Sequence, residues 1–139
     1  MSTTIAAAPS ADTPSADAAP LRWHHQHPVR VYWEDTDAGG IVFYGNYLKF
    51  MERARTEWFS AALGVGQEQL RRSGQGMFVV TDTQLRYLRP ARLDDRLVVT
   101  VAVAEVGRAS VSFAQTVRRG DTVLCEGRVR VGWVMPVAA

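Results

Sequence analysis

The sequence predicts an α+β fold in which one long helix packs against an antiparallel β-sheet. One segment near residue 50 repeats apolar residues at helical spacing, whereas nearly everything after Gly76 alternates apolar and polar residues as strands do. The segments between the strand-like runs are short, which is typical of antiparallel neighbours. A chain of 139 residues is long enough for one domain with a core of its own.

We expect a structured domain over residues 28–139, preceded by a disordered tail over residues 1–27. The start of the chain is rich in Ala, Ser, Thr and Pro, a composition that buries too little apolar surface to fold. It lacks the basic start and apolar centre of a secretory signal, and Asp12 and Asp17 argue against a transit peptide. The expected location is the cytoplasm, which also suits the single cysteine, Cys125.

The first expected strand covers residues 29–33, and the acids and glycines of "EDTDAGG" then predict a turn. A helix is expected over residues 46–63, with Asn46 as its N-cap and Gly64 as its stop. Its apolar stripe consists of Tyr47, Phe50, Met51, Ala54, Trp58 and Ala61 or Ala62.

Charged side chains occupy the other face of this helix. Glu52 with Arg55, and Arg53 with Glu57, fall at neighbouring positions there. After the helix, residues 66–76 are compatible with one short further helix.

Strand-like runs follow at residues 77–88, 96–106, 109–117 and 122–134. The short links between them predict a four-stranded meander, one face of which wraps the helix. Such a sheet leaves open edges, and open edges are usually covered or paired. We therefore expect a dimer whose sheets join edge to edge.

Composition excludes several classes of function. The net charge is only +2 and there is no run of Lys or Arg, so no nucleic-acid partner is expected. No stretch approaches the roughly 18–20 apolar residues that a membrane span requires. The histidines are His24, His25 and His27, which we expect to be an incidental cluster in the tail rather than a metal site.

Two acids, Asp35 and Asp37, stand just before the expected helix. Acids in this position commonly cap a turn. Alternatively, a carboxylate held beside the free N–H groups of a helix N-terminus suits attack on a carbonyl carbon. From the residues alone, both interpretations stay open.

The segment "EDTDAGGIVFYGNYLKFMERARTEW" resembles the signature of the hotdog-fold 4-hydroxybenzoyl-CoA thioesterase family. It is most similar to the branch of short acyl-CoA thioesterases associated with the Tol-Pal envelope system. The likeness extends through "RLDDRLVV" and "GRASVSF" to "RVRVGWV", over about residues 28–134. It implies a long central helix wrapped by an antiparallel sheet, and an enzyme that hydrolyses an acyl-CoA thioester to a free acid and CoA.

The resemblance also implies roles for individual residues. Asp37 matches the catalytic aspartate, which attacks the thioester carbonyl or activates water to do so. Tyr44 stands where the family offers a backbone N–H to the thioester oxygen, and Gly45 and Asn46 lead the substrate-binding segment into the helix. Arg108 matches the region that binds the nucleotide end of CoA, although an ordinary polar residue at a hairpin tip is an equal alternative.

The chain departs from its branch at Tyr44, where many members carry His and where the 4-hydroxybenzoyl branch carries Tyr. This difference favours a backbone role for Tyr44 and leaves aliphatic and aromatic acyl groups open. Asp35 matches a motif acid that we assign to shaping the loop. Because no His follows His27, the chain lacks the catalytic His of hotdog dehydratases and any Ser-His-Asp set.

No metal or redox cofactor is expected, since thiolate is a good leaving group and a carboxylate with an oxyanion site suffices. Expected partners are the acyl-CoA substrate, with acyl carrier protein as an alternative donor, and further copies of the chain in a homodimer or homotetramer. Two rival functions are a non-catalytic module that binds acyl-CoA or acyl carrier protein, and an interaction protein of an envelope or lipid-synthesis assembly.

Overall fold

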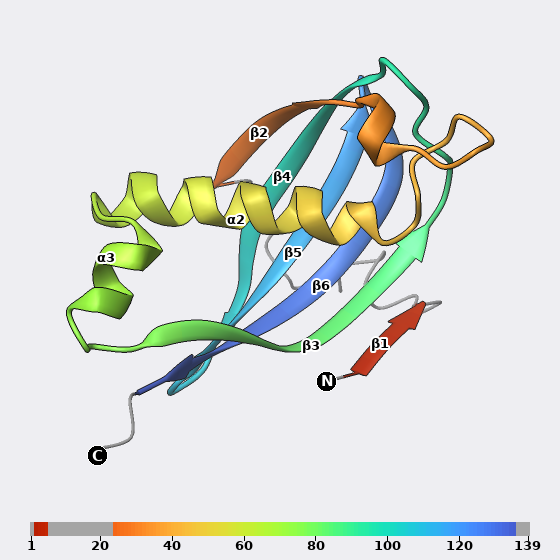
Figure 1. Cartoon of the computed structure of the whole chain (residues 1–139). Coiled ribbons are helices and arrows are strands. Elements are labelled where there is room, and N and C mark those ends of the chain that lie inside the picture. Colours follow the sequence, from red (N-terminus) through yellow and green to blue (C-terminus); the bar gives the residue numbers. More distant parts are fainter. Residues whose placement is uncertain (1, 6–23, 136–139) are drawn as a thin grey trace.

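Helix α2 (Asn46–Leu63) lies along one face of a curved β-sheet and is the central element of the fold (Figure 1). The computed structural model describes residues 2–5 and 24–135. Within them the sheet has the order β1-β3-β6-β5-β4-β2. Its strands are β1 (Ser2–Ile5), β2 (His25–Arg30), β3 (Met77–Tyr87), β4 (Arg96–Val106), β5 (Ser110–Arg119) and β6 (Thr122–Val134). A short 3-10 helix, η1 (Trp33–Asp35), precedes α2, and a short helix, α3 (Gln67–Arg72), follows it.

The predicted bounds of the long helix are confirmed, and its C-terminal stop is as expected. Gly64 adopts the left-handed conformation at φ 70°, and its N–H donates to the carbonyl of Ser60. At the N-terminal end, the predicted N-cap was one residue off: Gly45 is the N-cap, and Asn46 is the first helical residue. The Asn46 side chain bonds to the preceding loop instead of capping the helix.

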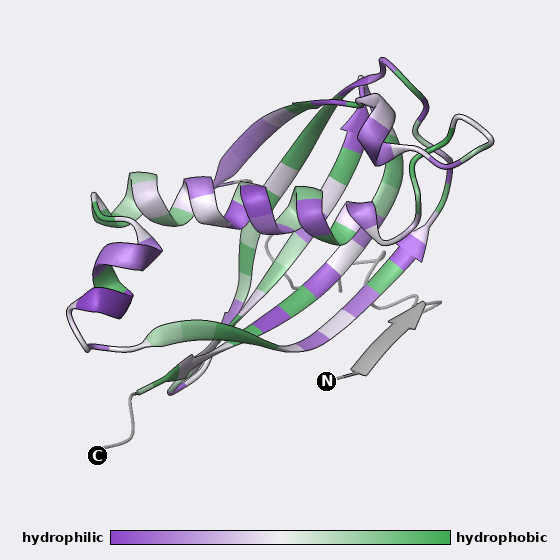
Figure 2. Cartoon of the chain, in the orientation of Figure 1, coloured by the Kyte–Doolittle hydropathy of each residue, from purple (hydrophilic) through white to green (hydrophobic). Residues whose placement is uncertain are grey.

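One face of α2 is packed against the sheet, as the apolar stripe predicted. Phe50, Met51 and Ala54 are completely buried, and they meet inward-facing β4 residues such as Leu97 and Val99. Figure 2 shows the corresponding alternation of hydrophobic and hydrophilic residues along α2 and the long strands. The stripe ends differently from the prediction: Ala61 and Ala62 are exposed, while Phe59 is buried in their place.

The N-terminal predictions need correction. Strand β2 begins at His25 and ends at Arg30, so the expected strand over residues 29–33 is shifted and Trp33 starts a 3-10 turn instead. The Asp35 carboxylate accepts the Tyr32 N–H, which turns the chain out of the sheet.

Two parts of the expected tail lie in strands: His25 and His27 pair with β4, and residues 2–5 pair in parallel with β3. The remainder of the expected tail, residues 1 and 6–23, lies outside the described residues. The domain boundary at residue 28 stays a prediction.

The four-stranded meander is also wrong in one connection. Strands β4, β5 and β6 are sequential antiparallel neighbours, but β3 pairs with β6 and not with β4. The link between β3 and β4 crosses the sheet end: Leu88 and Arg89 both donate to the carbonyl of Leu124, and Ala91 accepts the N–H of Val42. The loop before α2 thus bonds to this link, and β3 and β4 are not joined by a hairpin turn. The edge-to-edge dimer stays a prediction.

Across the part of the chain that the structure describes, no helix is long and apolar enough to cross a membrane.

Replacing Phe50 by alanine tests whether burial of α2 stabilises the fold. Phe50 is 0% exposed, so Phe50→Ala should lower the free energy of unfolding by about 3–5 kcal/mol through lost burial and a residual cavity. Urea denaturation measures this loss. The exposed neighbour Lys49 provides the control, because Lys49→Ala should change stability by no more than about 0.5 kcal/mol. Equal effects of the two substitutions would contradict the central place of this helix face.

Candidate active site

A small hairpin carries the two predicted acids into the start of α2. The N–H of Phe43 donates to the Asp35 carbonyl at 3.0 Å, and the N–H of Asp37 donates to the Ile41 carbonyl at 2.9 Å. Between them, Thr36 and Val42 form an antiparallel bridge. The glycines of the motif occupy the hairpin tip, where Gly40 has a positive φ of 76°. The motif therefore folds into a defined turn that leads directly to the helix.

Asp35 ties this hairpin to the rest of the fold. Its side chain is buried, and Oδ2 accepts the Tyr32 N–H at 2.8 Å. Its carbonyl oxygen accepts from Nδ2 of Asn46, also at 2.8 Å. Asn46 is itself buried, so this polar pair fixes the hairpin against the first turn of α2.

Asp37, in contrast, is exposed. Its Oδ1 accepts the Gly39 N–H at 2.8 Å, the arrangement of an Asx turn. Its Oδ2 has no hydrogen-bond partner among residues 2–5 and 24–135. The turn-capping interpretation of Asp37 thus describes one carboxylate oxygen and leaves the other available.

The start of α2 carries backbone donors without acceptors, and the first two of them are adjacent. No side chain caps this helix, and within the described residues neither the Tyr44 N–H nor the Gly45 N–H has an acceptor. The flanking N–H groups of Phe43 and Asn46 are both bonded. Because the helix dipole adds partial positive charge here, the pair forms a site suited to an anionic oxygen.

Tyr87, at the end of β3, holds the peptide between these two donors. Its hydroxyl donates to the Tyr44 carbonyl at 3.0 Å, and its ring contacts Tyr44 and Tyr47 edge to face. Burial raises the pKa of Tyr87 to about 12, so the hydroxyl remains a donor at neutral pH. Sequence reasoning missed this residue, since an aromatic residue at a strand end is common and its partner lies 43 positions away.

Arg108 lies far from this cluster. It is exposed at the tip of the β4–β5 hairpin, beyond the last residue of β4. The first residues of β4 lie near the predicted loop, because Asp95 accepts the Val31 N–H. A strand of this length spans about 30 Å or more. One chain therefore brings together Asp37, Tyr44, Gly45 and Asn46, but not Arg108.

The family model described as the thioesterase superfamily matches residues 39–129, most of the described domain. The chain belongs to the thioesterase superfamily. The acyl-CoA thioesterase YbgC of Haemophilus influenzae is 44% identical over 107 residues, which cover 77% of this chain and 78% of that protein. The acyl-CoA thioester hydrolase YbgC of Escherichia coli is 38% identical over 123 residues, 84% of each chain. The family recognised from the loop motif is thus confirmed.

Comparison with solved structures confirms the hotdog fold. A probable thioesterase from Bartonella henselae superposes with a TM-score of 0.75 at 28% identity, over 80% of this chain and 91% of that one. The Tol-Pal association and the individual site residues stay predictions.

Titration of tyrosine absorbance tests the environment of Tyr87. The difference between wild type and Tyr87→Phe should show one tyrosine that ionises at about pH 12, against about 10 for a free tyrosine. Because the folded pKa is the higher one, the neutral hydroxyl stabilises the fold fully below pH about 10. That contribution should disappear as the pH rises through about 12. A difference spectrum with a midpoint near 10 would show that Tyr87 is freely solvated.

Proposed function

We propose that this protein is an acyl-CoA thioesterase that hydrolyses a thioester to a free carboxylic acid and CoA. Membership of the thioesterase superfamily and the names of its YbgC relatives support this activity. The structural observation that carries it is the pair of unbonded N–H groups at Tyr44 and Gly45, beside the hairpin that holds Asp37.

In the proposed reaction, the thioester carbonyl oxygen lies against the N–H groups of Tyr44 and Gly45. Negative charge grows on this oxygen as the carbonyl carbon becomes tetrahedral, so donors fixed beforehand stabilise the transition state more than the substrate. Because a peptide unit is planar and its C=O and N–H point in opposite directions, the Tyr87 bond to the Tyr44 carbonyl also orients the Gly45 N–H.

Asp37 supplies the second half of the chemistry. As a general base, its carboxylate takes a proton from water while the water oxygen bonds to the carbonyl carbon. The C–S bond then breaks, and the departing thiolate takes the proton from Asp37. As a nucleophile, Asp37 itself bonds to the carbonyl carbon and expels CoA, and water then cleaves the mixed anhydride. Both routes use the carboxylate oxygen that the Asx turn leaves free.

We further propose that a second copy of the chain completes the site. The loop segment exposes aromatic side chains that a monomer would be expected to bury: Tyr32 at 59%, Trp33 at 77%, Phe43 at 47% and Tyr44 at 66%. A partner subunit that covers this surface would exclude water from the Asp37 carboxylate. It would also supply Arg108 to the CoA phosphates, which the Arg108 of the same chain cannot reach. We expect this assembly to be a cytoplasmic homodimer or homotetramer.

Asp37→Asn is the direct test of the catalytic acid. Asparagine keeps the oxygen that accepts the Gly39 N–H, but it cannot accept a proton or attack the thioester. Turnover of a panel of short aliphatic, long aliphatic and aromatic acyl-CoAs, followed by thiol release, should fall roughly 10²- to 10⁴-fold. The exposed turn residue Asp121 provides the matched control, and Asp121→Asn should be as active as wild type. Unchanged turnover in a folded Asp37→Asn protein would favour the binding module over the enzyme.

A pair of substitutions at Gly45 isolates its N–H group. Gly45 has a φ of −70°, which proline adopts, whereas a Cβ there contacts only the exposed Phe43 ring. Gly45→Pro removes the donor and should lower kcat roughly 10²- to 10³-fold, while Gly45→Ala keeps the donor and most of the activity. Both variants should retain the circular dichroism spectrum of wild type. Equal activity of the two folded variants would exclude Gly45 from the oxyanion site.

A further inference from the structure

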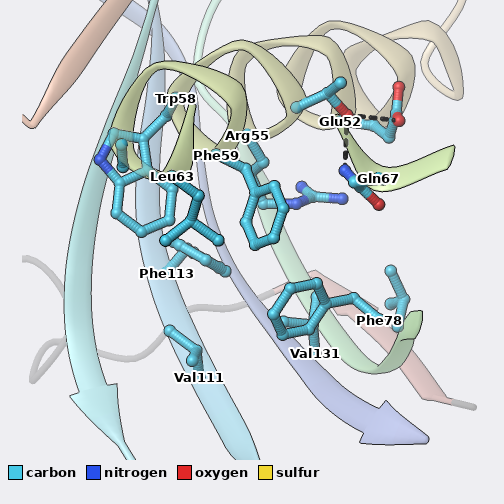
Figure 3. Close-up of a pocket in the computed structure, with 13 residues that line it drawn as sticks. Glu52, Arg55, Trp58, Phe59, Leu63, Gln67, Phe78, Val111, Phe113 and Val131 are labelled. Atoms are coloured by element: carbon cyan, nitrogen blue, oxygen red, sulfur yellow. Dashed lines mark hydrogen bonds between the residues drawn. The ribbon is translucent and has the colours of Figure 1, made fainter. Parts of the chain in front are cut away.

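A pocket of about 360 Å³ lies between the C-terminal half of α2 and the inner face of the sheet (Figure 3). Its volume is within the range of small-molecule sites. Most of the wall is apolar and includes Trp58, Phe59, Ala62, Leu63, Phe78 and Phe113. Leu63 is 55% exposed at the rim, whereas Phe113 is 5% exposed at the floor, so the pocket opens to solvent on one side.

This pocket is separate from the candidate active site. Trp58 lies about 18 Å along the helix axis from Asn46, at about 1.5 Å per residue. The completely buried side chains of Phe50, Met51 and Ala54 occupy the stretch between the two. A ligand in the pocket therefore does not reach the Asp37 loop of the same chain.

One cation, Arg55, lines this otherwise apolar wall. Its Nη1 donates to Oε1 of Gln115 at 2.9 Å. Gln115 is 1% exposed, and its amide nitrogen donates to the carbonyls of Met51 and Thr100. Figure 3 shows the guanidinium beneath α2 and beside Phe59. Arg55 is thus held at a fixed position by a buried amide, rather than pairing with Glu52 on the polar face as the sequence suggested.

The guanidinium has no ion-pair partner within the described residues. No carboxylate lies within 4.0 Å of it there, and Glu52, which shares the rim, is exposed and accepts from the Thr56 hydroxyl. Burial lowers the pKa of Arg55 and the charge of Glu52 raises it, but a guanidinium remains charged at neutral pH. A half-buried cation beside an apolar cavity is most stable when an anion with an apolar body joins it.

We propose that this pocket binds a medium-chain aliphatic carboxylic acid, with its carboxylate on Arg55 and its alkyl chain between the aromatic walls. The rings of the wall pack edge to face in two pairs. The ring centroids of Trp58 and Phe113 are 5.5 Å apart, and those of Phe59 and Phe78 are 5.1 Å apart. They form two fixed walls that leave a slot for a flexible chain. The site selects a free acid over a thioester, since a thioester has no carboxylate, and it goes beyond the proposed function without depending on it.

Calorimetric titration with octanoate and octanol, which share an alkyl chain, tests the carboxylate. Wild type should bind octanoate at one site per chain and at least about tenfold more tightly than octanol. Arg55→Met, which keeps the length and removes the charge, should lose this preference. Across hexanoate, octanoate and decanoate, each added methylene should tighten binding roughly three- to fourfold. Octanoate binding that is absent in wild type, or unchanged in Arg55→Met, would overturn the proposal.

A second variant keeps the test independent of Arg55. Ala62 is exposed at the rim, so Ala62→Trp should fill the pocket without disturbing the fold and should abolish octanoate binding. Asp37→Asn should bind octanoate like wild type, so a failure of the proposed hydrolysis would leave this result intact. Inhibition of wild-type thiol release by octanoate, lost in Arg55→Met, would further support the proposal, because it would show that an acid held by Arg55 affects turnover.

Discussion

The fold depends on the burial of one face of α2 against the curved sheet. This contact excludes Phe50, Met51 and Ala54 from water entirely, and it places the ends of the helix at the two ends of the sheet. The N-terminal end cannot satisfy its own first N–H groups. Ser, Thr, Asp and Asn are preferred there because their side chains accept these N–H groups, but the N-cap of α2 is a glycine that has no such side chain. The same burial that builds the core thus fixes a pair of open donors at a defined place beside the Asp37 hairpin.

Polar contacts then connect this end of the helix to the rest of the molecule, and the one between Asp35 and Asn46 is buried. Asp35 joins the 3-10 turn to Asn46, and Tyr87 joins strand β3 to the peptide between Tyr44 and Gly45. Leaving the buried Asn46 amide without its Asp35 partner would cost about 1–3 kcal/mol. Sheet, loop and helix therefore hold one another in register. Rigid placement of donors is also what stabilisation of a developing oxyanion requires, since donors that must reorganise contribute less.

Sequence patterns predicted the features that depend on neighbouring residues, namely the bounds of α2 and the positions of the long strands. The apolar stripe and Gly64 predicted the helix, and the alternation of apolar and polar residues predicted the long strands. Both patterns work because an element that buries one face repeats apolar residues at its own structural period. Alternation does not say which strand is the neighbour, so the β3–β6 pairing was missed. Arg55 was assigned to the polar face although it follows Met51 by four positions and precedes Trp58 by three. The signal was present, because Gln115 also stood among inward-facing residues of its strand, but the bond between them joins residues 60 positions apart.

The separation of the two proposed sites along α2 follows from what each does with charge. In the proposed reaction, the N–H pair at Tyr44 and Gly45 faces a neutral thioester and stabilises charge that exists only as the reaction proceeds, which increases the rate. A fixed cation such as Arg55 stabilises charge that persists in the acid product. Placed at the reacting carbonyl, it would retain the product and slow turnover. With the packed core between them, the proposed active site can release its acid product, and the proposed Arg55 pocket can retain a carboxylate without slowing that release.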